Sequence, residues 1–269
     1  MNLENQTMST EELQLDAQTI IDAKRHRLSI RQDATPNNAL VALATMQKAP
    51  RTVLNIVTAD DHVTLIGQIR HENIYDPVSK ALRYVRYGVD AITLFTDNKI
   101  YSKGMDDLSF ITRGINSPII SQDYIINEYH VTEARAAGAS AIMIYASHLD
   151  QSAVRGLVSL SARWRMTSMV QVNNADELAY VAGLSPHVIA VGLDQNFVRE
   201  RDLPKIEQLK PLMPFNTRFM ALGCFTKIED VETLLDIGVD AIIVDEVLFK
   251  TKSSAQRLFE LLDNNYNNK

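Results

Sequence analysis

The strongest constraint on the fold is a glycine-led pentapeptide that occurs three times in the chain. It reads GVDAI at 88–92, GASAI at 138–142 and GVDAI again at 238–242, so the copies are spaced by multiples of 50 residues. Each copy follows an amphipathic stretch, and its glycine stands where a helix is expected to end. Each then leads into a short apolar run typical of a buried strand. Helix, glycine and strand form the αβ half of a crossover unit, and the spacing accommodates units of about 25 residues.

Apolar runs predict eight strands along the chain. They lie at 63–69, 91–95, 118–121, 141–145, 168–172, 188–193, 218–222 and 241–245. Because these runs are apolar throughout, the strands are expected to be buried on both faces, as in a parallel sheet. Strands of this kind that alternate with helices predict an α/β fold, the (β/α)8 TIM barrel, and 269 residues suit one such barrel.

A helical extension is predicted ahead of the barrel. Two stretches with helical periodicity lie at 13–32 and 38–47, before the first strand. Apolar residues on one face of each stretch favour packing over a free tail. We therefore expect residues 1–60 to form an N-terminal helical extension packed on the barrel of residues 61–269, with no second domain.

Composition and charge exclude several classes of protein. Hydrophobic residues make up 46% and charged residues 22%, which is typical of a globular protein. No apolar run approaches the roughly 18 residues that span a bilayer, and the first residues lack the features of a signal peptide. A cytoplasmic protein without membrane association is therefore expected. The net charge of −6 argues against nucleic acid as a partner, and an unknown small molecule or protein partner fits better.

The sequence shows no pattern typical of a metal or cofactor site. The single cysteine, Cys224, cannot form an internal disulfide, and no cysteine and histidine residues have zinc-ligand spacing. The chain has 10 glycines in 269 residues, a share below the typical usage of about 7%, which argues against a glycine-rich phosphate loop. We expect no metal and no cofactor, and we expect Cys224 to be a small buried hydrophobic residue.

Polar residues follow the predicted strands, at the end of the barrel where this fold places its catalytic groups. Gln68, Gln122 and Gln171 lie at three of these strand ends. Glutamine hydrogen-bonds but does not titrate, so these side chains can orient a ligand without exchanging protons with it. Titratable groups are also predicted at or near this rim: Arg70, His71, Asp123, His148, Asp194 and Asp245. The simplest expectation is that the histidines are solvated.

The segment PIISQDYIINEYHVTEARAAGASAIMI, at 118–144, resembles the third-strand region of indole-3-glycerol phosphate synthases. In that family the segment typically begins Pro-Val-Leu-Arg-Lys-Asp-Phe-Ile-Ile-Asp. AITLFTD at 91–97 is similar to the family's Ala-Ile-Ser-Val-Leu-Thr-Asp, and Ile20, Ile21, Lys24 and Arg25 match its N-terminal helix. The resemblance covers nearly the whole chain. It implies a (β/α)8 barrel with an N-terminal helical segment, and an enzyme of tryptophan biosynthesis that closes an indole ring with loss of carbon dioxide and water.

The departures from the family fall on its catalytic positions. Gln122 stands where the resemblance places the lysine that acts as general acid, and Gln171 stands in place of the glutamate that acts as base. The family's Ala-Glu-Ile-Lys is Gly-Gln-Ile-Arg here, so Gln68 replaces a glutamate and Arg70 replaces a lysine. The Ser-Pro-Ser that follows has become Asn-Ile-Tyr at 73–75. For Arg70, an ion pair with a neighbouring carboxylate, such as Asp97 or Asp123, is the simplest expectation.

The ligand-binding positions depart as well. Leu-Gly-Cys-Phe at 222–225 replaces the seventh-strand Glu-Ser-Gly-Ile, and Asp245 replaces the glycine after the eighth strand. A carboxylate there would repel a phosphate that the family binds through exposed backbone N–H groups. The sixth-strand Gly-Ile-Asn-Asn-Arg is Gly-Leu-Asp-Gln-Asn at 192–196. The ligand-binding candidates are Asp123, Asp194, Asn196, Gly223, Cys224, Asp245 and Glu246.

These observations leave three hypotheses for the function. Losing one positioned general acid or base costs about 10² to 10⁴ in rate, although such losses need not add. This favours a pseudoenzyme, a barrel that binds a ligand or a protein partner without the family's chemistry. The first alternative is an enzyme with altered chemistry on a non-phosphorylated small molecule, which would tolerate the carboxylates. The second is residual synthase activity, with the cationic Arg70 facing an anionic ligand.

Overall fold

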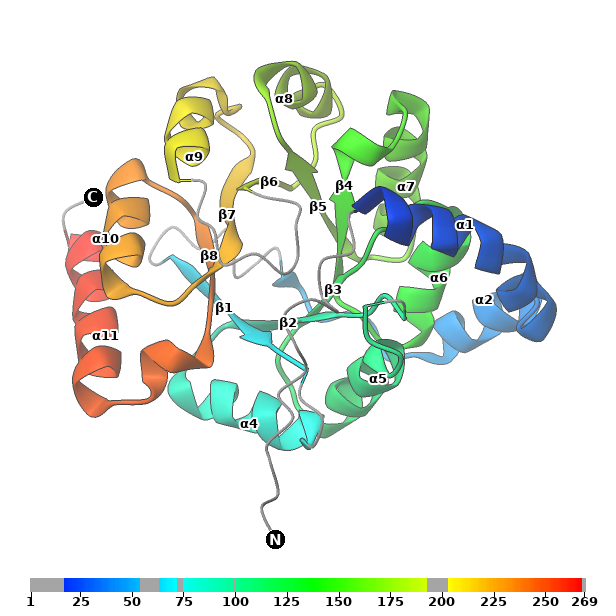
Figure 1. Cartoon of the computed structure of the whole chain (residues 1–269), viewed down its shortest axis with the longest axis horizontal. Helices are drawn as coiled ribbons and strands as arrows, with labels where there is room; N and C mark the ends of the chain where they lie inside the picture. Colours follow the sequence, from blue (N-terminus) through cyan, green and yellow to red (C-terminus); the bar gives the residue numbers. More distant parts are fainter. Residues whose placement is uncertain (1–16, 54–62, 72–74, 99, 193–202, 268–269) are drawn as a thin grey trace, which may run out of the picture.

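Eight parallel strands close into a barrel in the computed structural model, which describes residues 17–53, 63–71, 75–98, 100–192 and 203–267 (Figure 1). The strands are β1 (Thr64–Ile69), β2 (Ala91–Phe95), β3 (Ile119–Gln122), β4 (Ala141–Tyr145), β5 (Thr167–Val172), β6 (Val188–Gly192), β7 (Arg218–Phe225) and β8 (Ala241–Val244). They follow one another around the barrel in sequence order, and β8 pairs in parallel with β1. The predicted (β/α)8 barrel is confirmed.

Helices surround the strands on the outside of the barrel (Figure 1). They are α4 (Pro77–Tyr87), α5 (Gly104–Gly114), α6 (Glu128–Ala136), α7 (Gln151–Arg163), α8 (Ala175–Ala182), α9 (Leu203–Leu209), α10 (Ile228–Ile237) and α11 (Lys252–Asn267), with short 3-10 turns η2 (Ala146–His148), η3 (Lys210–Leu212) and η4 (Glu246–Phe249). None of the described helices is long and apolar enough to cross a membrane.

The glycines of the repeat end helices, as predicted. Gly88 and Gly238 cap α4 and α10 with φ values of 88° and 82°, a left-handed conformation that glycine adopts without strain. The aspartate two residues later has a second role in both copies. Asp90 Oδ2 accepts a hydrogen bond from the backbone N of Leu65 at 2.8 Å, and Asp240 Oδ2 accepts one from Phe219 at 2.7 Å. The repeat therefore ties the start of each strand to its neighbour.

Two layers of apolar side chains form the core. One fills the barrel interior and includes Ile66, Met143 and Met220, while the other lies between the strands and the outer helices. The interior cluster also contains Ile20 and Ile21, both 1% exposed. These two residues belong to an N-terminal helix, so the extension contributes directly to the core of the barrel.

The extension consists of α1 (Ala17–Ala34) and α2 (Asn37–Met46) in the described residues. Figure 1 shows α1 beside the ends of β3 and β4, and α2 beside α6. Arg135 of α6 donates a hydrogen bond from Nη2 to Gln47 O at 3.1 Å, and Gln47 Nε2 donates one to Ala136 O at 2.6 Å. The segment after α2 is thereby attached to the outer helix layer. The predicted extension also includes 1–16 and 54–60, which lie outside the described residues.

Candidate functional site

Two of the rim glutamines meet inside the barrel. Gln68 at the end of β1 donates a hydrogen bond from Nε2 to Oε1 of Gln122 at the end of β3, at 3.0 Å. Both side chains are buried, with 7% and 2% exposure. The two amides partly satisfy each other, and neither can gain or lose a proton near neutral pH. At this position the rim holds a neutral hydrogen-bonded pair.

The third glutamine lies in separate surroundings. Gln171 of β5 donates from Nε2 to Asn173 Oδ1 and to Gly192 O, both at 2.8 Å. Its Oε1 is buried and has no hydrogen-bond partner among the described residues. A buried unpaired acceptor costs about 1–3 kcal/mol. The sequence predicted all three glutamines at the rim but could not show which of them pair.

A buried cluster of charges joins the extension to the barrel. The ammonium of Lys24 on α1 donates to Asp97 Oδ2 at 2.9 Å and to Asp123 Oδ1, and all three residues are at most 5% exposed. Burial alone would lower the pKa of Lys24, but the carboxylates of Asp123 and Asp97 outweigh it and raise that pKa. Burial, opposed by Lys24 and reinforced by the like charge of Asp97, raises the pKa of Asp123 to about 7.

Arg70 forms its ion pair elsewhere than expected. Its Nε lies 2.8 Å from Asp245 Oδ2, whereas Asp97 and Asp123 bind Lys24 instead. The expected ion pair with a neighbouring carboxylate is therefore confirmed, but the partner is not one of the two aspartates named, because α1 supplies the cation that binds them. Asp245 also accepts a hydrogen bond from the backbone N of Val247 at 2.9 Å, which begins η4. The carboxylate is thus held at the end of β8 by a cation and a backbone donor.

The neighbouring residues complete this corner of the barrel. Cys224 Sγ lies 3.8 Å from Asp245 Oδ2. Burial raises the pKa of Cys224 to about 11 although Arg70 opposes the shift, so the group is a neutral thiol at pH 7. It is only partly buried and contacts charged groups, so it is not the fully buried hydrophobic residue that was expected. Gly223 has a φ of 147°, and Glu246 pairs with Arg83 at 2.9 Å.

His71 also differs from its prediction. Its side chain is 10% exposed and its ring stacks on Tyr101 with centroids 3.5 Å apart, so it is largely buried. Its Nε2 contacts Phe95 O at 2.9 Å, and its Nδ1 contacts the hydroxyl of Tyr75 at 2.7 Å. Burial lowers the pKa of His71 to about 4, so the ring is neutral at pH 7. Its contacts are therefore with a cluster of tyrosines and not with Arg70.

Some predicted site residues lie outside the described residues or apart from the site. Asp194 and Asn196 are not among the residues that the structure describes. His148 of η2 is partly buried, and its ring lies 5.5 Å from that of Tyr124. In the described part of the chain, no group of three or more histidine, cysteine, aspartate or glutamate residues could hold a metal ion.

Gly67 was missed as a constrained position. A Cβ there would lie 2.4 Å from Cδ1 of Tyr84, whose hydroxyl donates to Gln68 O at 2.8 Å. The aromatic ring under β1 therefore excludes the alanine that the resemblance places at this position. A tyrosine in the following helix was the only signal in the sequence, and it carried no information about which strand residue it would contact.

Comparison with known proteins identifies the family of this chain. The family model for indole-3-glycerol phosphate synthase matches residues 15–261. The chain belongs to the indole-3-glycerol phosphate synthase family. Among its curated relatives, the synthase of Roseiflexus sp. (strain RS-1) is 27% identical over 259 residues, which cover 90% of this chain and 94% of the relative. The synthase of Dehalococcoides mccartyi (strain CBDB1) is 30% identical over 199 residues, covering 73% and 76%.

Solved structures of other barrel enzymes share the fold of this family member. A 3-hexulose-6-phosphate synthase superposes with a TM-score of 0.59 at 16% identity and covers 74% of this chain and 99% of its own. The corresponding enzyme of Salmonella typhimurium gives a TM-score of 0.61 at 13% identity, covering 75% and 99%. At these identities the likeness concerns the barrel alone.

Proposed function

We propose that this member of the synthase family has lost the ring-closing decarboxylation and acts as a pseudoenzyme, a barrel that binds a ligand or a protein partner. The observation that carries the proposal is the hydrogen bond between the Gln68 and Gln122 amides. The resemblance places a glutamate and the general-acid lysine at these positions. Two opposite charges are thus replaced by a neutral pair joined by one hydrogen bond.

The third glutamine, Gln171, also offers no group that can transfer a proton. Gln171 stands where the resemblance places the general base, and its amide nitrogen is engaged by Asn173 and Gly192. An amide neither accepts nor releases a proton near pH 7, so the steps assigned to acid and base have no group to perform them at these positions. Each such loss costs about 10² to 10⁴ in rate, and even a non-additive combination removes efficient turnover.

The corner beside β7 and β8 supports the same conclusion. Asp245 supplies a carboxylate that pairs with Arg70 at 2.8 Å. A phosphate entering there would have to compete with this internal anion for Arg70 and would meet its repulsion. We infer that the ligand of this barrel does not carry a phosphate at that corner.

Genetic complementation tests the proposal directly. A strain that lacks the synthase would receive this chain, the triple variant Gln68→Glu/Gln122→Lys/Gln171→Glu, or Gln151→Lys as a control with the same chemical change on an exposed helix. We expect no growth without tryptophan from the unmodified chain or the control. Growth supported by the unmodified chain, with formation of the fluorescent indole product by the purified protein at ordinary enzymatic rates, would overturn the proposal.

A second candidate function is an enzyme with altered chemistry on a neutral or cationic small molecule. What supports it is a buried carboxyl after β3: Asp123 is 1% exposed and accepts a hydrogen bond from Lys24, and burial raises its pKa to about 7. Asp123→Asn distinguishes the two functions once turnover of any compound is found. The variant should lose kcat in the altered enzyme, and the pH profile should lose its limb near 7. A pseudoenzyme would show no turnover to lose.

A further inference from the structure

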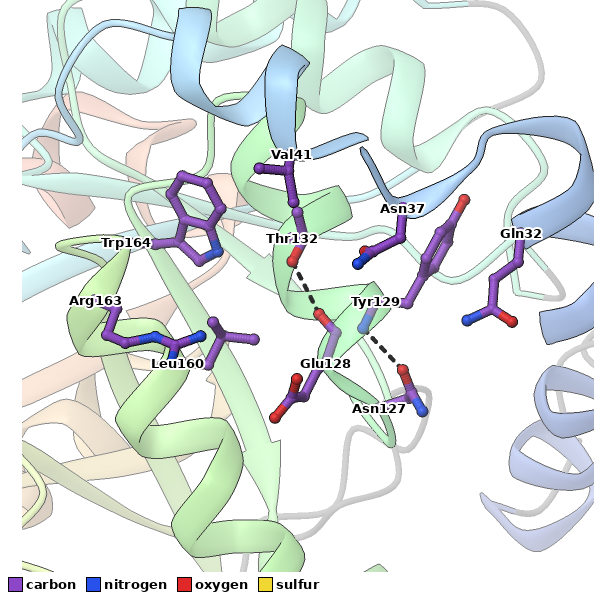
Figure 2. Close-up of a pocket in the computed structure, with 10 residues that line it drawn as sticks. All are labelled: Gln32, Asn37, Val41, Asn127, Glu128, Tyr129, Thr132, Leu160, Arg163 and Trp164. Atoms are coloured by element: carbon purple, nitrogen blue, oxygen red, sulfur yellow. Dashed lines mark hydrogen bonds between the residues drawn. The ribbon is translucent and has the colours of Figure 1, made fainter. Parts of the chain in front are cut away.

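A groove on the outer surface is lined by aromatic, aliphatic and charged side chains that are not part of the barrel mouth. It has a volume of about 540 Å³ and lies where the extension meets α6 and α7 (Figure 2). Ligand pockets commonly have volumes of about 300–1,000 Å³. None of the rim residues discussed above lines this groove, so a ligand bound here would be separate from any ligand at the barrel mouth.

Apolar side chains form one part of the wall. Trp164, at the end of α7, lies in Figure 2 opposite Val41 of α2, with Leu160 one turn earlier on α7. The indole is partly exposed, and Val41 is 38% exposed although it is aliphatic. An indole face with two aliphatic neighbours favours an aromatic or large aliphatic group, since aromatic side chains pack with specific geometry and large contact area.

Two opposite charges line the same groove. Arg163 extends from the last turn of α7, and Glu128 is the first residue of α6. Both are exposed, and in the described part of the chain neither forms a salt bridge. A guanidinium binds a carboxylate with two parallel hydrogen bonds, and a carboxylate binds an ammonium group. The amides of Gln32 and Asn37 add further polar groups from the extension.

We propose that this groove binds a free amino acid with a large apolar side chain. Its carboxylate pairs with Arg163 and its ammonium group with Glu128, while its side chain lies against Trp164, Val41 and Leu160. A zwitterion can pair with both charges at once, whereas a ligand with only one charge can pair with only one of them. Since α2 and α6 both line the groove, binding would also tie the extension more firmly to the barrel.

The chain provides its own reporter, because Trp164 is the single tryptophan. L-Phenylalanine is the probe, and phenethylamine and 3-phenylpropionate are analogues that lack the carboxylate and the ammonium group. We expect a saturable change in Trp164 fluorescence with L-phenylalanine at concentrations up to about 10 mM, the weak range for a small ligand in an open site. Each analogue should bind about three- to tenfold more weakly, as exposed ion pairs contribute modestly.

Matched variants decide whether the groove is the site. Arg163→Gln and Glu128→Gln should each weaken L-phenylalanine binding about three- to tenfold, whereas Arg155→Gln, an exposed arginine on α7 outside the groove, should leave it unchanged. Circular dichroism would check that each variant is folded. The proposal is overturned if L-phenylalanine causes no saturable change, if the two analogues bind as well as the zwitterion, or if the groove variants behave like the control.

Discussion

Replacing Lys24 with methionine would remove the cation that lies between two buried carboxylates. Methionine preserves most of the length of the side chain, so the main change is the loss of charge and hydrogen bonds. Asp97 and Asp123 are 2% and 1% exposed, and the variant would remove the ammonium group that contacts both of them. Removing one partner of a buried ion pair costs about 3–5 kcal/mol. For a protein of this size that corresponds to a fall in Tm of about 6–20 °C.

The loss of stability in Lys24→Met should depend on pH, because the buried carboxyl beside Lys24 titrates. Burial already raises the pKa of Asp123 to about 7, above its unfolded value of about 4. A carboxyl whose pKa is raised in the folded state binds more protons there, so its stability is greatest at low pH and is lost as pH rises towards the folded pKa. Lys24 opposes this shift, so the pKa of Asp123 rises further without it. Lys24→Met should therefore be more destabilising at pH 8 than at pH 5.5.

Urea unfolding followed by Trp164 fluorescence measures this cost. The control is Arg25→Met on the same helix, where the ion pair with Asp22 is about half exposed and contributes about 0–1 kcal/mol. Adding Asp123→Asn to Lys24→Met should recover part of the loss, because it removes one of the two buried carboxylates that contacted Lys24. The reasoning is refuted if Lys24→Met is as stable as the control at pH 8, or if its cost is larger at pH 5.5.

Three further results are expected. Gly67→Ala should lower the free energy of unfolding in urea by about 1–3 kcal/mol, because the added Cβ would lie 2.4 Å from the ring of Tyr84. A second change, Tyr84→Leu, should reduce that loss. Equal stability of Gly67→Ala and the wild type would contradict this expectation. Asp245→Asn should free Arg70, so phosphate should raise the Tm of this variant and not of the wild type. Cys224 should react slowly with iodoacetamide at pH 8 and faster as pH rises towards 11, because burial raises its pKa to about 11; a rate at pH 8 like that of free cysteine would show otherwise.

Local chemistry made most of the fold predictable. Gly88 and Gly238 were expected at helix ends because few other residues adopt a positive φ, and both occur there. The predicted strand at 118–121 overlaps Ile119–Gln122, and that at 241–245 overlaps Ala241–Val244. These features depend on residues close together in the chain, where periodicity and capping preferences are informative.

The candidate site was less predictable because its contacts are distant in sequence. Gln68 and Gln122 are 54 positions apart, and their hydrogen bond depends on side-chain conformations that a pattern does not specify. An ion pair of Arg70 with a carboxylate was predicted, but its partner was not, because Lys24 binds Asp97 and Asp123, which lie 73 and 99 positions further along the chain. An expected ion pair can only be assigned once every competing charge has been placed.

The same distances affect the order in which the chain can assemble during synthesis. Helix α1 leaves the ribosome before the strands of the barrel. The groups that bind Lys24 follow 73 and 99 residues later, and Glu133, which binds Arg31, follows 102 residues after its partner. All three carboxylates precede β4 in the chain. Helix α1 must therefore wait until α6 is made for its full set of ionic contacts, but it need not wait for the second half of the barrel. These ionic contacts can form while β1 still lacks the β8 strand that closes the sheet, which gives the nascent N-terminal half long-range contacts of its own before the interior apolar cluster is filled.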